Sequence, residues 1–173
     1  ADKIKRMFKN NKDYGMQMLS IEKGIIFDSV ARLNFISDLV KKFDNNSLIL
    51  FSDVKNQYGK RICNKIREWN KDTFYIDGGV ETEDREMYAM ERKEGVIIVA
   101  SFGTFSTGID LKNVHHILFV ETTKAEITIR QSIGRGMRML TDKNKVIIWD
   151  LIDDLDGYSV KHSQIREKIY IEQ

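Results

Sequence analysis

The sequence predicts an α/β domain that is built on a parallel β-sheet, and two observations predict this class. Short apolar runs recur along the chain, and the stretches that separate them leave room for helices. Several of those stretches carry apolar residues three and four positions apart, as one face of a helix does. Short apolar runs that alternate with helical patterns are typical of parallel sheets.

Five apolar runs are the expected strands. They are Leu48–Phe51, Phe74–Ile76, Val96–Ala100, Ile117–Val120 and Val146–Trp149. A helix is predicted before the first strand, because apolar residues lie at helical spacing from Asp28 onward and the pattern ends at the turn residues 44–46. The apolar positions of this helix are Val30, Leu33, Ile36, Val40 and Phe43.

The remaining helices follow from similar patterns. Between the first two strands, the expected helix face consists of Tyr58, Ile62, Ile66 and Trp69, and Cys63 beside it is interpreted as a core thiol. Residues 1–24 are polar and lysine-rich and predict short helices, the second of them after Gly15. The charged stretch Val160–Gln173 is expected to form a last helix.

Composition excludes several classes of protein. The chain has 173 residues, of which 42% are hydrophobic, and this suits one globular domain. Its single cysteine cannot form an internal disulfide, and no apolar stretch approaches the ~20 residues that span a bilayer. A net charge of +2 is too small to attract nucleic acid over long range, so any such role rests on placed residues. The first residue is Ala1 and not Met, which points to a processed or excised piece.

Two segments resemble parts of a nucleotide-binding site. Gly103 and Gly108 follow a strand at the spacing of a phosphate-binding P-loop, but Ile109 and Asp110 stand where that loop needs Lys and Ser/Thr. The apolar run that ends at Asp150 resembles the Mg²⁺-binding strand of P-loop enzymes. Without a true P-loop, an ordinary strand that ends in an acid is the simpler interpretation.

Metal binding is the weaker interpretation of the remaining polar clusters. Asp150, Asp153 and Asp154 could form a metal-nuclease cluster, but three acids in one loop are more often a solvated turn. His115 and His116 are adjacent and point to opposite faces of an extended segment, which disfavours shared metal ligation. We therefore expect the two histidines to be structural and assign no metal site.

The most informative segment is the helical pattern from Ala125 to Leu140. Gln131, Arg135 and Arg138 lie on one stripe, opposite an apolar stripe. A surface helix with two arginines is the simplest explanation. However, glycines at 134 and 136 cost about 1 kcal/mol each in a helix interior, and close approach of a ligand or another backbone to the arginine face would account for them.

These residues match a known pattern. Gln131, Gly134, Arg135 and Arg138 fit the Q-x-x-G-R-x-x-R sequence of motif VI in superfamily 2 helicases, and residues 106–110 resemble their motif V. Residues 48–52 resemble motif IV, and the segment from Gly78 to Glu86 resembles the glycine-then-Glu/Arg segment that follows it. Residues 100–108, 113–116 and 149–154 most resemble the UvsW-type recombination and repair helicases of T-even bacteriophages. The resemblance covers about residues 28–155.

The resemblance implies a fold and a domain plan. The chain would be the C-terminal of two RecA-like lobes, with about five or six parallel strands and helices in three layers. Residues 1–27 would be a helical lead-in or inter-lobe linker, 28–155 the lobe, and 156–173 a C-terminal extension. The implied partners are the N-terminal RecA-like lobe and DNA or RNA, in the cytoplasm of a bacterial or phage-infected cell, with no membrane involved.

The resemblance also implies roles for single residues. ATP and Mg²⁺ would be held mainly by the first lobe, which carries the P-loop, and this lobe alone would be inactive. Arg138 would be the arginine finger and Arg135 a second γ-phosphate contact, with Gln131, Gly108 and Asp110 also at the ATP. The residues expected to face the nucleic acid are Ser52, Gly79, Ser101 and Thr104. The loop is one residue longer than in many relatives, so either Ser101 or Thr104 can be the phosphate contact.

Two functions remain open at the level of sequence. The first is the C-terminal motor lobe of an ATP-dependent helicase that remodels branched nucleic acid in recombination or repair. The second is a non-catalytic nucleic-acid-binding or adaptor module that keeps the RecA-like shell. A P-loop in the coding sequence upstream of Ala1 would favour the first function, and its absence would favour the second.

Overall fold

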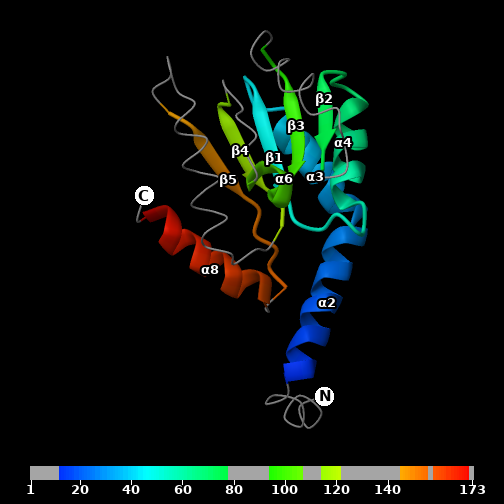
Figure 1. Ribbon diagram of the computed structural model, residues 1–173, viewed down its shortest axis with the longest axis vertical. Coiled ribbons are helices and arrows are strands. Elements are labelled where there is room, and N and C mark those ends of the chain that lie inside the picture. Colours follow the sequence, from blue (N-terminus) through cyan, green and yellow to red (C-terminus); the bar gives the residue numbers. More distant parts are fainter. Residues whose placement is uncertain (1–11, 78–93, 107–113, 122–144, 156–157, 172–173) are drawn as a thin grey trace.

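A computed structural model describes residues 12–77, 94–106, 114–121, 145–155 and 158–171 (Figure 1). Five strands form one sheet in the order β2-β3-β1-β4-β5, and every pairing is parallel. The strands are β1 (Ser47–Phe51), β2 (Thr73–Ile76), β3 (Ile97–Ser101), β4 (His116–Phe119) and β5 (Ile147–Asp150). Each lies within a residue of the run that predicted it, so the α/β class and its parallel sheet are confirmed.

Side chains of the strands alternate between two hydrophobic clusters, one on each face of the sheet. In β1, for example, Leu48 and Leu50 join the first cluster, whereas Ile49 and Phe51 join the second. The central strands β1, β3 and β4 are buried along their whole length. Burial on both faces explains why these strands are continuous apolar runs in the sequence.

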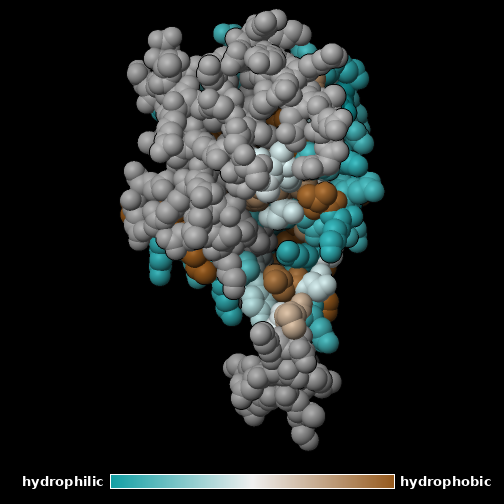
Figure 2. Space-filling model, viewed as in Figure 1, coloured by the Kyte–Doolittle hydropathy of each residue, from teal (hydrophilic) through white to brown (hydrophobic). Residues whose placement is uncertain are grey.

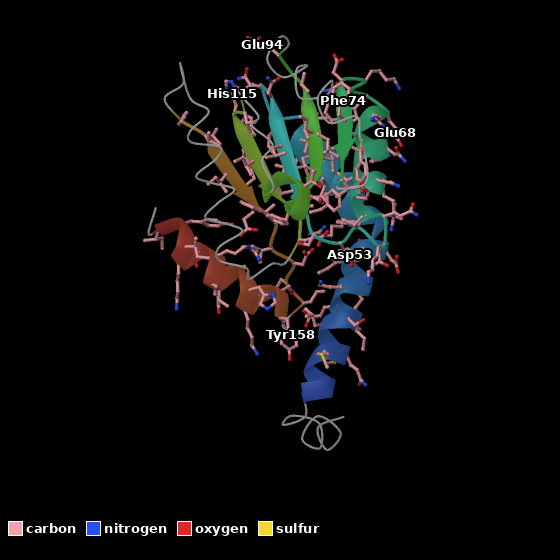
Figure 3. All side chains as sticks on the ribbon, viewed as in Figure 1. Asp53, Glu68, Phe74, Glu94, His115 and Tyr158 are labelled. Atoms are coloured by element: carbon pink, nitrogen blue, oxygen red, sulfur yellow. The ribbon has the colours of Figure 1, made fainter. Side chains whose placement is uncertain are left out.

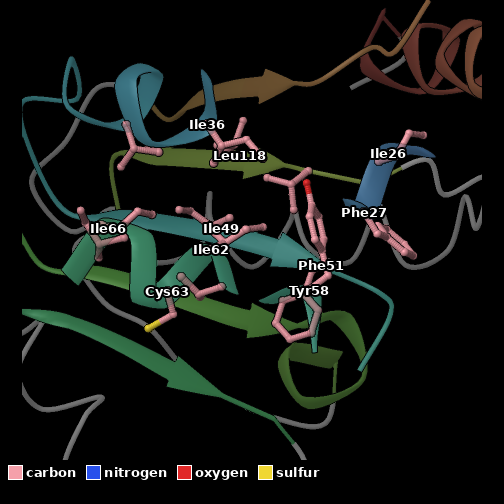
Figure 4. Packing of buried hydrophobic residues seen from close by; sticks show 14 residues of the cluster. Ile26, Phe27, Ile36, Ile49, Phe51, Tyr58, Ile62, Cys63, Ile66 and Leu118 are labelled. Atoms are coloured by element: carbon pink, nitrogen blue, oxygen red, sulfur yellow. The ribbon is translucent and has the colours of Figure 1, made fainter. Parts of the chain in front are cut away.

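Helices α3 (Val30–Val40) and α4 (Tyr58–Arg67) cover the face that carries the second cluster (Figures 1 and 4). Ser29 begins α3, and its Oγ accepts a hydrogen bond of 3.1 Å from the backbone N–H of Arg32. Two residues of the expected apolar helix faces are exposed in the structure, Val30 by 64% and Trp69 by 38%. Val30 is the first residue of α3, and Trp69 follows the end of α4.

The expectation of short helices near the start is wrong for the described residues. One helix, α2 (Lys12–Asp28), runs through Gly15 and Gly24. A Cβ at Gly15 would lie 2.7 Å from the hydroxyl oxygen of Tyr158, so this glycine permits close packing and does not break the helix. At its other end, α2 places Ile26 and Phe27 in the second cluster (Figure 4).

The opposite face carries α6 (Phe102–Ser106) and α8 (Tyr158–Ile171), the helix expected at the end of the chain. Phe102 and Ile169 join the first cluster, so helices flank both faces of the sheet and make three layers. The carboxylate of Glu22 in α2 accepts hydrogen bonds from the backbone N–H groups of Tyr158 and Ser159 at the start of α8. Among the described residues, no helix is long and apolar enough to cross a membrane.

Apolar side chains also remain on the surface. Figure 2 shows hydrophobic residues among hydrophilic ones along α2, whereas the surface over α4 is mainly hydrophilic. The large hydrophobic side chains of α2 that are exposed are Met16, Ile21 and Ile25.

Candidate functional site

The carboxyl ends of parallel strands are the usual ligand-binding edge of an α/β sheet, and polar residues gather at that edge here. Ser52 follows β1, Ser101 ends β3 and Glu121 follows β4 just beyond Val120. Figure 3 shows Asp53, the neighbour of Ser52, at the edge nearest α2, while Glu94 and His115 mark the opposite edge. The three central strands therefore deliver three polar side chains to one edge.

Two of the predicted nucleic-acid contacts are neighbours. Phe51 pairs with Ser101 in the register of β1 and β3, so Ser52 lies one position beyond this pair. The Ser52 side chain is exposed, whereas Ser101 and Thr104 are 4% and 5% exposed. The structure thus brings Ser52 and Ser101 to adjacent strand ends.

Ser101 and Thr104 interact with each other. Their hydroxyl oxygens are 2.8 Å apart, and the Ser101 Oγ accepts a hydrogen bond of 3.2 Å from the backbone N–H of Thr104. Ser101 thereby supports the start of α6, as Ser often does at the first turn of a helix. The contact of either hydroxyl with a nucleic-acid strand stays a prediction.

Glu121 is a buried acid at the same edge, with 2% exposure. Its Oε1 and Oε2 lie 3.1 and 3.2 Å from the backbone nitrogen of Asp53, whose N–H donates to both. Burial raises the pKa of the Glu121 carboxyl, while the N–H groups of Asp53 and Ser52 and the charge of Lys23 oppose the rise. The carboxylate thus holds the backbone that carries Ser52.

Arg32 in α3 forms hydrogen bonds with α4 and with the segments that follow β4 and β5. Its Nε and Nη2 donate to the two carboxylate oxygens of Asp153 at 2.6 and 2.8 Å. Nη2 also donates to the carbonyl oxygen of Val120 at 2.7 Å, and Nη1 donates to the Tyr58 hydroxyl oxygen. Burial acts to lower the pKa of Arg32, but Asp153 and Tyr58 outweigh it and leave the pKa raised, so the guanidinium stays charged.

A polar pocket of about 340 Å³ lies beside the Ser52 turn, between α2 and the start of α4. Lys23 and Arg61 contribute positive charges to its wall, while Asp28 and Asp53 contribute negative ones. Arg61 is held from behind, because its Nη1 donates to the carbonyl oxygen of Phe27 at 2.7 Å. The other lining residues are Ser20, Gly24, Phe27 and Asn56.

Of the three acids that the sequence predicted to form a solvated turn after β5, Asp154 is exposed, but Asp150 and Asp153 are each paired with an arginine. Asp150 accepts hydrogen bonds of 2.7 and 2.9 Å from the Nε and Nη2 of Arg166, which is fully buried in α8. Asp153 is paired with Arg32 as described above. In the described ranges, no group of three or more His, Cys, Asp or Glu side chains is arranged to hold a metal ion.

Cys63 and His116 were expected to have structural roles. Cys63 is buried in the second cluster, which confirms its interpretation as a core thiol. The Nε2 of His116 lies 2.8 Å from an oxygen of Asp44, and its Nδ1 accepts a hydrogen bond of 3.1 Å from the Trp149 indole. His116 is therefore a structural residue that joins β4 to β5.

The remaining predicted site residues lie outside the described residues. They are Gly79, Gly108, Asp110, Gln131, Arg135 and Arg138. Their roles stay predictions.

Comparison with known proteins identifies the family. The model of the helicase conserved C-terminal domain matches residues 31–140, which include β1 to β4 and the segment with Gln131, Arg135 and Arg138. The chain belongs to this family. The match confirms the resemblance to superfamily 2 helicases that the motifs indicated.

Among curated proteins, this helicase C-terminal domain is similar to the ATP-dependent DNA helicase uvsW of Enterobacteria phage T4. The identity is 37% over 127 residues, which are 72% of this chain and 25% of that protein. The chain therefore spans about a quarter of the length of this relative.

Among solved structures, the crystal structure of T4 UvsW matches 99% of this chain and 37% of that chain, with a TM-score of 0.69 and 28% identity. The C-terminal part of the Fun30 ATPase domain matches 81% of this chain and 46% of that chain, with a TM-score of 0.64 and 16% identity. The second likeness shows the fold alone. Both support a RecA-like arrangement of the five strands.

Sequence reasoning missed Glu121 and Arg32. Glu121 directly follows an apolar strand, and this is the signal that drew attention to Asp150. Arg32 lies four residues before Ile36 and therefore on the buried stripe of α3, where a charged residue needs a partner. A search for charged residues on apolar faces would have found it.

Proposed function

We propose that this chain is the C-terminal motor lobe of an ATP-dependent helicase that remodels branched DNA in recombination or repair. The observation that carries the proposal is the family match over residues 31–140, because it includes the proposed strand contacts and the arginine segment. The similarity to a phage ATP-dependent DNA helicase supports ATP use and a DNA substrate. We further propose that the protein works in the cytoplasm of a bacterial or phage-infected host cell.

ATP would bind in the cleft between this lobe and a P-loop-bearing first lobe. Phosphoryl transfer depends mainly on positioning and on cations that neutralise charge on the γ-phosphate. Arg138 would be the arginine finger, Arg135 would contact the same phosphate, and Gln131 would orient the group. Gly108 and Asp110 would lie beside the nucleotide.

Mg²⁺, when bound, would neutralise charge on the phosphates of ATP. The acids near the end of β5 do not offer a site for it, because Asp150 and Asp153 are each paired with an arginine. This pairing supports the assignment of the metal mainly to the first lobe. No step of the proposed chemistry in this lobe passes through the metal.

The carboxyl edge of the sheet would hold the nucleic-acid backbone. Ser52, Gly79, Ser101 and Thr104 are the proposed contacts. Hydroxyl and backbone N–H groups bind phosphate oxygens and position a strand without reading its sequence. This mode of binding requires no strongly basic surface, which suits a chain with a net charge of +2.

The arginine-finger role can be tested by changing Arg138 to Ala in the full-length two-lobe protein. We expect ATP turnover to fall by about 10³-fold or more, because an arginine finger contributes 10³–10⁵ to kcat. Steady-state ATP hydrolysis in the presence of DNA measures the effect, and the melting temperature should stay unchanged. Arg67→Ala is a matched control, because Arg67 lies at the end of α4 and donates to the carbonyl oxygen of Thr73. Normal turnover in Arg138→Ala would remove Arg138 from the mechanism.

A non-catalytic binding or adaptor module is the second candidate. Ile109 and Asp110 stand where a P-loop has Lys and Ser/Thr, which fits this candidate as well as a motor lobe whose P-loop lies in the first lobe. A coding sequence that lacks a P-loop upstream of Ala1 would favour this candidate over the motor lobe.

A further inference from the structure

The turn after β1 is held by a carboxylate from a different strand. In the register of the parallel pair β1 and β4, Leu50 lies opposite Phe119, so Ser52 lies opposite Glu121. Both oxygens of the buried Glu121 carboxylate accept a hydrogen bond from the backbone N–H of Asp53. The backbone N–H of Ser52 also interacts with this carboxylate by hydrogen bonding. Two consecutive N–H groups of the turn are therefore directed at one side chain.

The same contact organises the rest of the turn. The Asp53 side chain accepts hydrogen bonds from the backbone N–H of Asn56 at 3.0 Å and from its Nδ2 at 2.8 Å. Ser52 thus stands between Phe51, which is fully buried, and Asp53, whose backbone is held by Glu121. The backbone on each side of the exposed Ser52 is fixed.

Glu121 itself has little freedom to move. The carbonyl oxygen of the preceding residue, Val120, accepts a hydrogen bond from Arg32, and the Val120 N–H donates to the carbonyl oxygen of Leu50 at 3.2 Å. Arg32 is in turn paired with Asp153. Because these interactions fix the segment that carries Glu121, its carboxylate can fix the position of the turn that it binds.

A purely stabilising role explains this arrangement less well. Burying an ionised carboxylate is costly, and a neutral side chain would fill the space at lower cost. The hydrogen bonds that Glu121 accepts come from the turn that carries Ser52. Its charge is therefore used to hold two backbone N–H groups in the turn.

We propose that Glu121 is a positioning residue that fixes the Ser52 hydroxyl for contact with a phosphate of the bound nucleic-acid strand. This inference rests on the proposed function. The N–H groups of Ser52 and Asp53 are directed at Glu121, so the contact with the strand falls to the Ser52 hydroxyl. Glu121 acts through Ser52 and does not touch the strand.

A double-mutant cycle tests this proposal in the full-length protein. The variants are Glu121→Gln, Ser52→Ala and the combination, and the measurement is the Kd for a fluorescein-labelled oligothymidylate. We expect each single change to raise the Kd about tenfold, and the double variant to bind no more weakly than Ser52→Ala. A merely structural role for Glu121 would instead weaken binding in both backgrounds alike.

A second measurement shows whether the turn itself has moved. Glu121→Gln should speed hydrogen exchange at the amides of Ser52 and Asp53, while amides within β2 keep their rates. Glu167→Gln, on the exposed side of α8, is the matched control and should leave both Kd and exchange unchanged.

Three results would contradict the positioning role of Glu121, and one of them would also contradict the proposed function. An unchanged Kd in a folded Glu121→Gln protein would overturn the positioning role alone. Equal weakening by Glu121→Gln with and without Ser52 would also overturn it. A failure of the unsubstituted protein to bind the oligothymidylate would overturn the proposed function, and the positioning role with it.

Discussion

Buried charged side chains near the carboxyl edge of the sheet form ion pairs or hydrogen bonds with groups that are distant in the sequence. Arg32 and Asp153 are separated by 121 positions and form a hydrogen-bonded ion pair. Glu121 is matched by backbone N–H groups of the turn after β1. Because removing one member of such a set leaves a buried charge or donor without its partner, these residues are expected to be sensitive to substitution.

The titration of Glu121 gives a prediction at the scale of one residue. Burial raises its pKa above the ordinary value of 4.5 in the folded state, so the folded protein binds the proton more tightly than the unfolded chain does. This contribution to stability is fully present below the unfolded pKa and is lost as the pH rises through the folded pKa. We expect the unsubstituted protein to gain stability relative to Glu121→Gln as the pH is lowered from neutral pH to a pH near the unfolded value of 4.5.

Melting temperatures of the two proteins at both pH values measure this difference, because glutamine does not titrate. All other ionisable groups are shared and cancel in the comparison. A difference that stays constant, or that moves against the unsubstituted protein as the pH falls, would contradict a raised pKa for Glu121.

At the scale of elements, the strands were predictable because their signal is local. Each is a short apolar run, and β1, β3 and β4 are buried on both faces, so few other structures suit them. The continuity of α2 was not predictable, because the packing of Tyr158 against Gly15 involves residues far apart in the chain. The pairing of Asp153 with Arg32 and of Asp150 with Arg166 escaped prediction for the same reason.

Two helical glycines give opposite predictions. A Cβ at Gly24 would meet nothing within 4 Å, so Gly24→Ala should stabilise the protein by up to about 1 kcal/mol. A Cβ at Gly59 would lie 2.4 Å from ring atoms of Phe51, which is fully buried and cannot move away. Gly59→Ala should therefore destabilise the protein by about 1–3 kcal/mol.

Urea unfolding of the two variants and the unsubstituted protein measures both changes, and each variant serves as the control for the other. A Gly59→Ala protein as stable as Gly24→Ala would show that α4 does not pack on Phe51 as closely as described.

At the scale of the whole molecule, the sheet, its helices and the family match show a helicase C-terminal domain, which we propose to be one lobe of a two-lobe motor. The fold could be predicted from apolar periodicity, whereas the site could be predicted only from motif resemblance. Ser52 and Ser101 lie at neighbouring strand ends, and their contact with nucleic acid stays a prediction. The buried Glu121 behind Ser52 belongs to none of the motif segments that were recognised, and its role depends on the register of β1 and β4.

We propose that this lobe turns over ATP only together with a P-loop-bearing first lobe. The most direct test is steady-state ATP hydrolysis, with and without DNA, by the 173-residue chain alone and by the full-length two-lobe protein. We expect no turnover by the chain alone and DNA-stimulated turnover by the two-lobe protein. Turnover by the isolated chain, or none by the two-lobe protein with DNA present, would contradict this proposal.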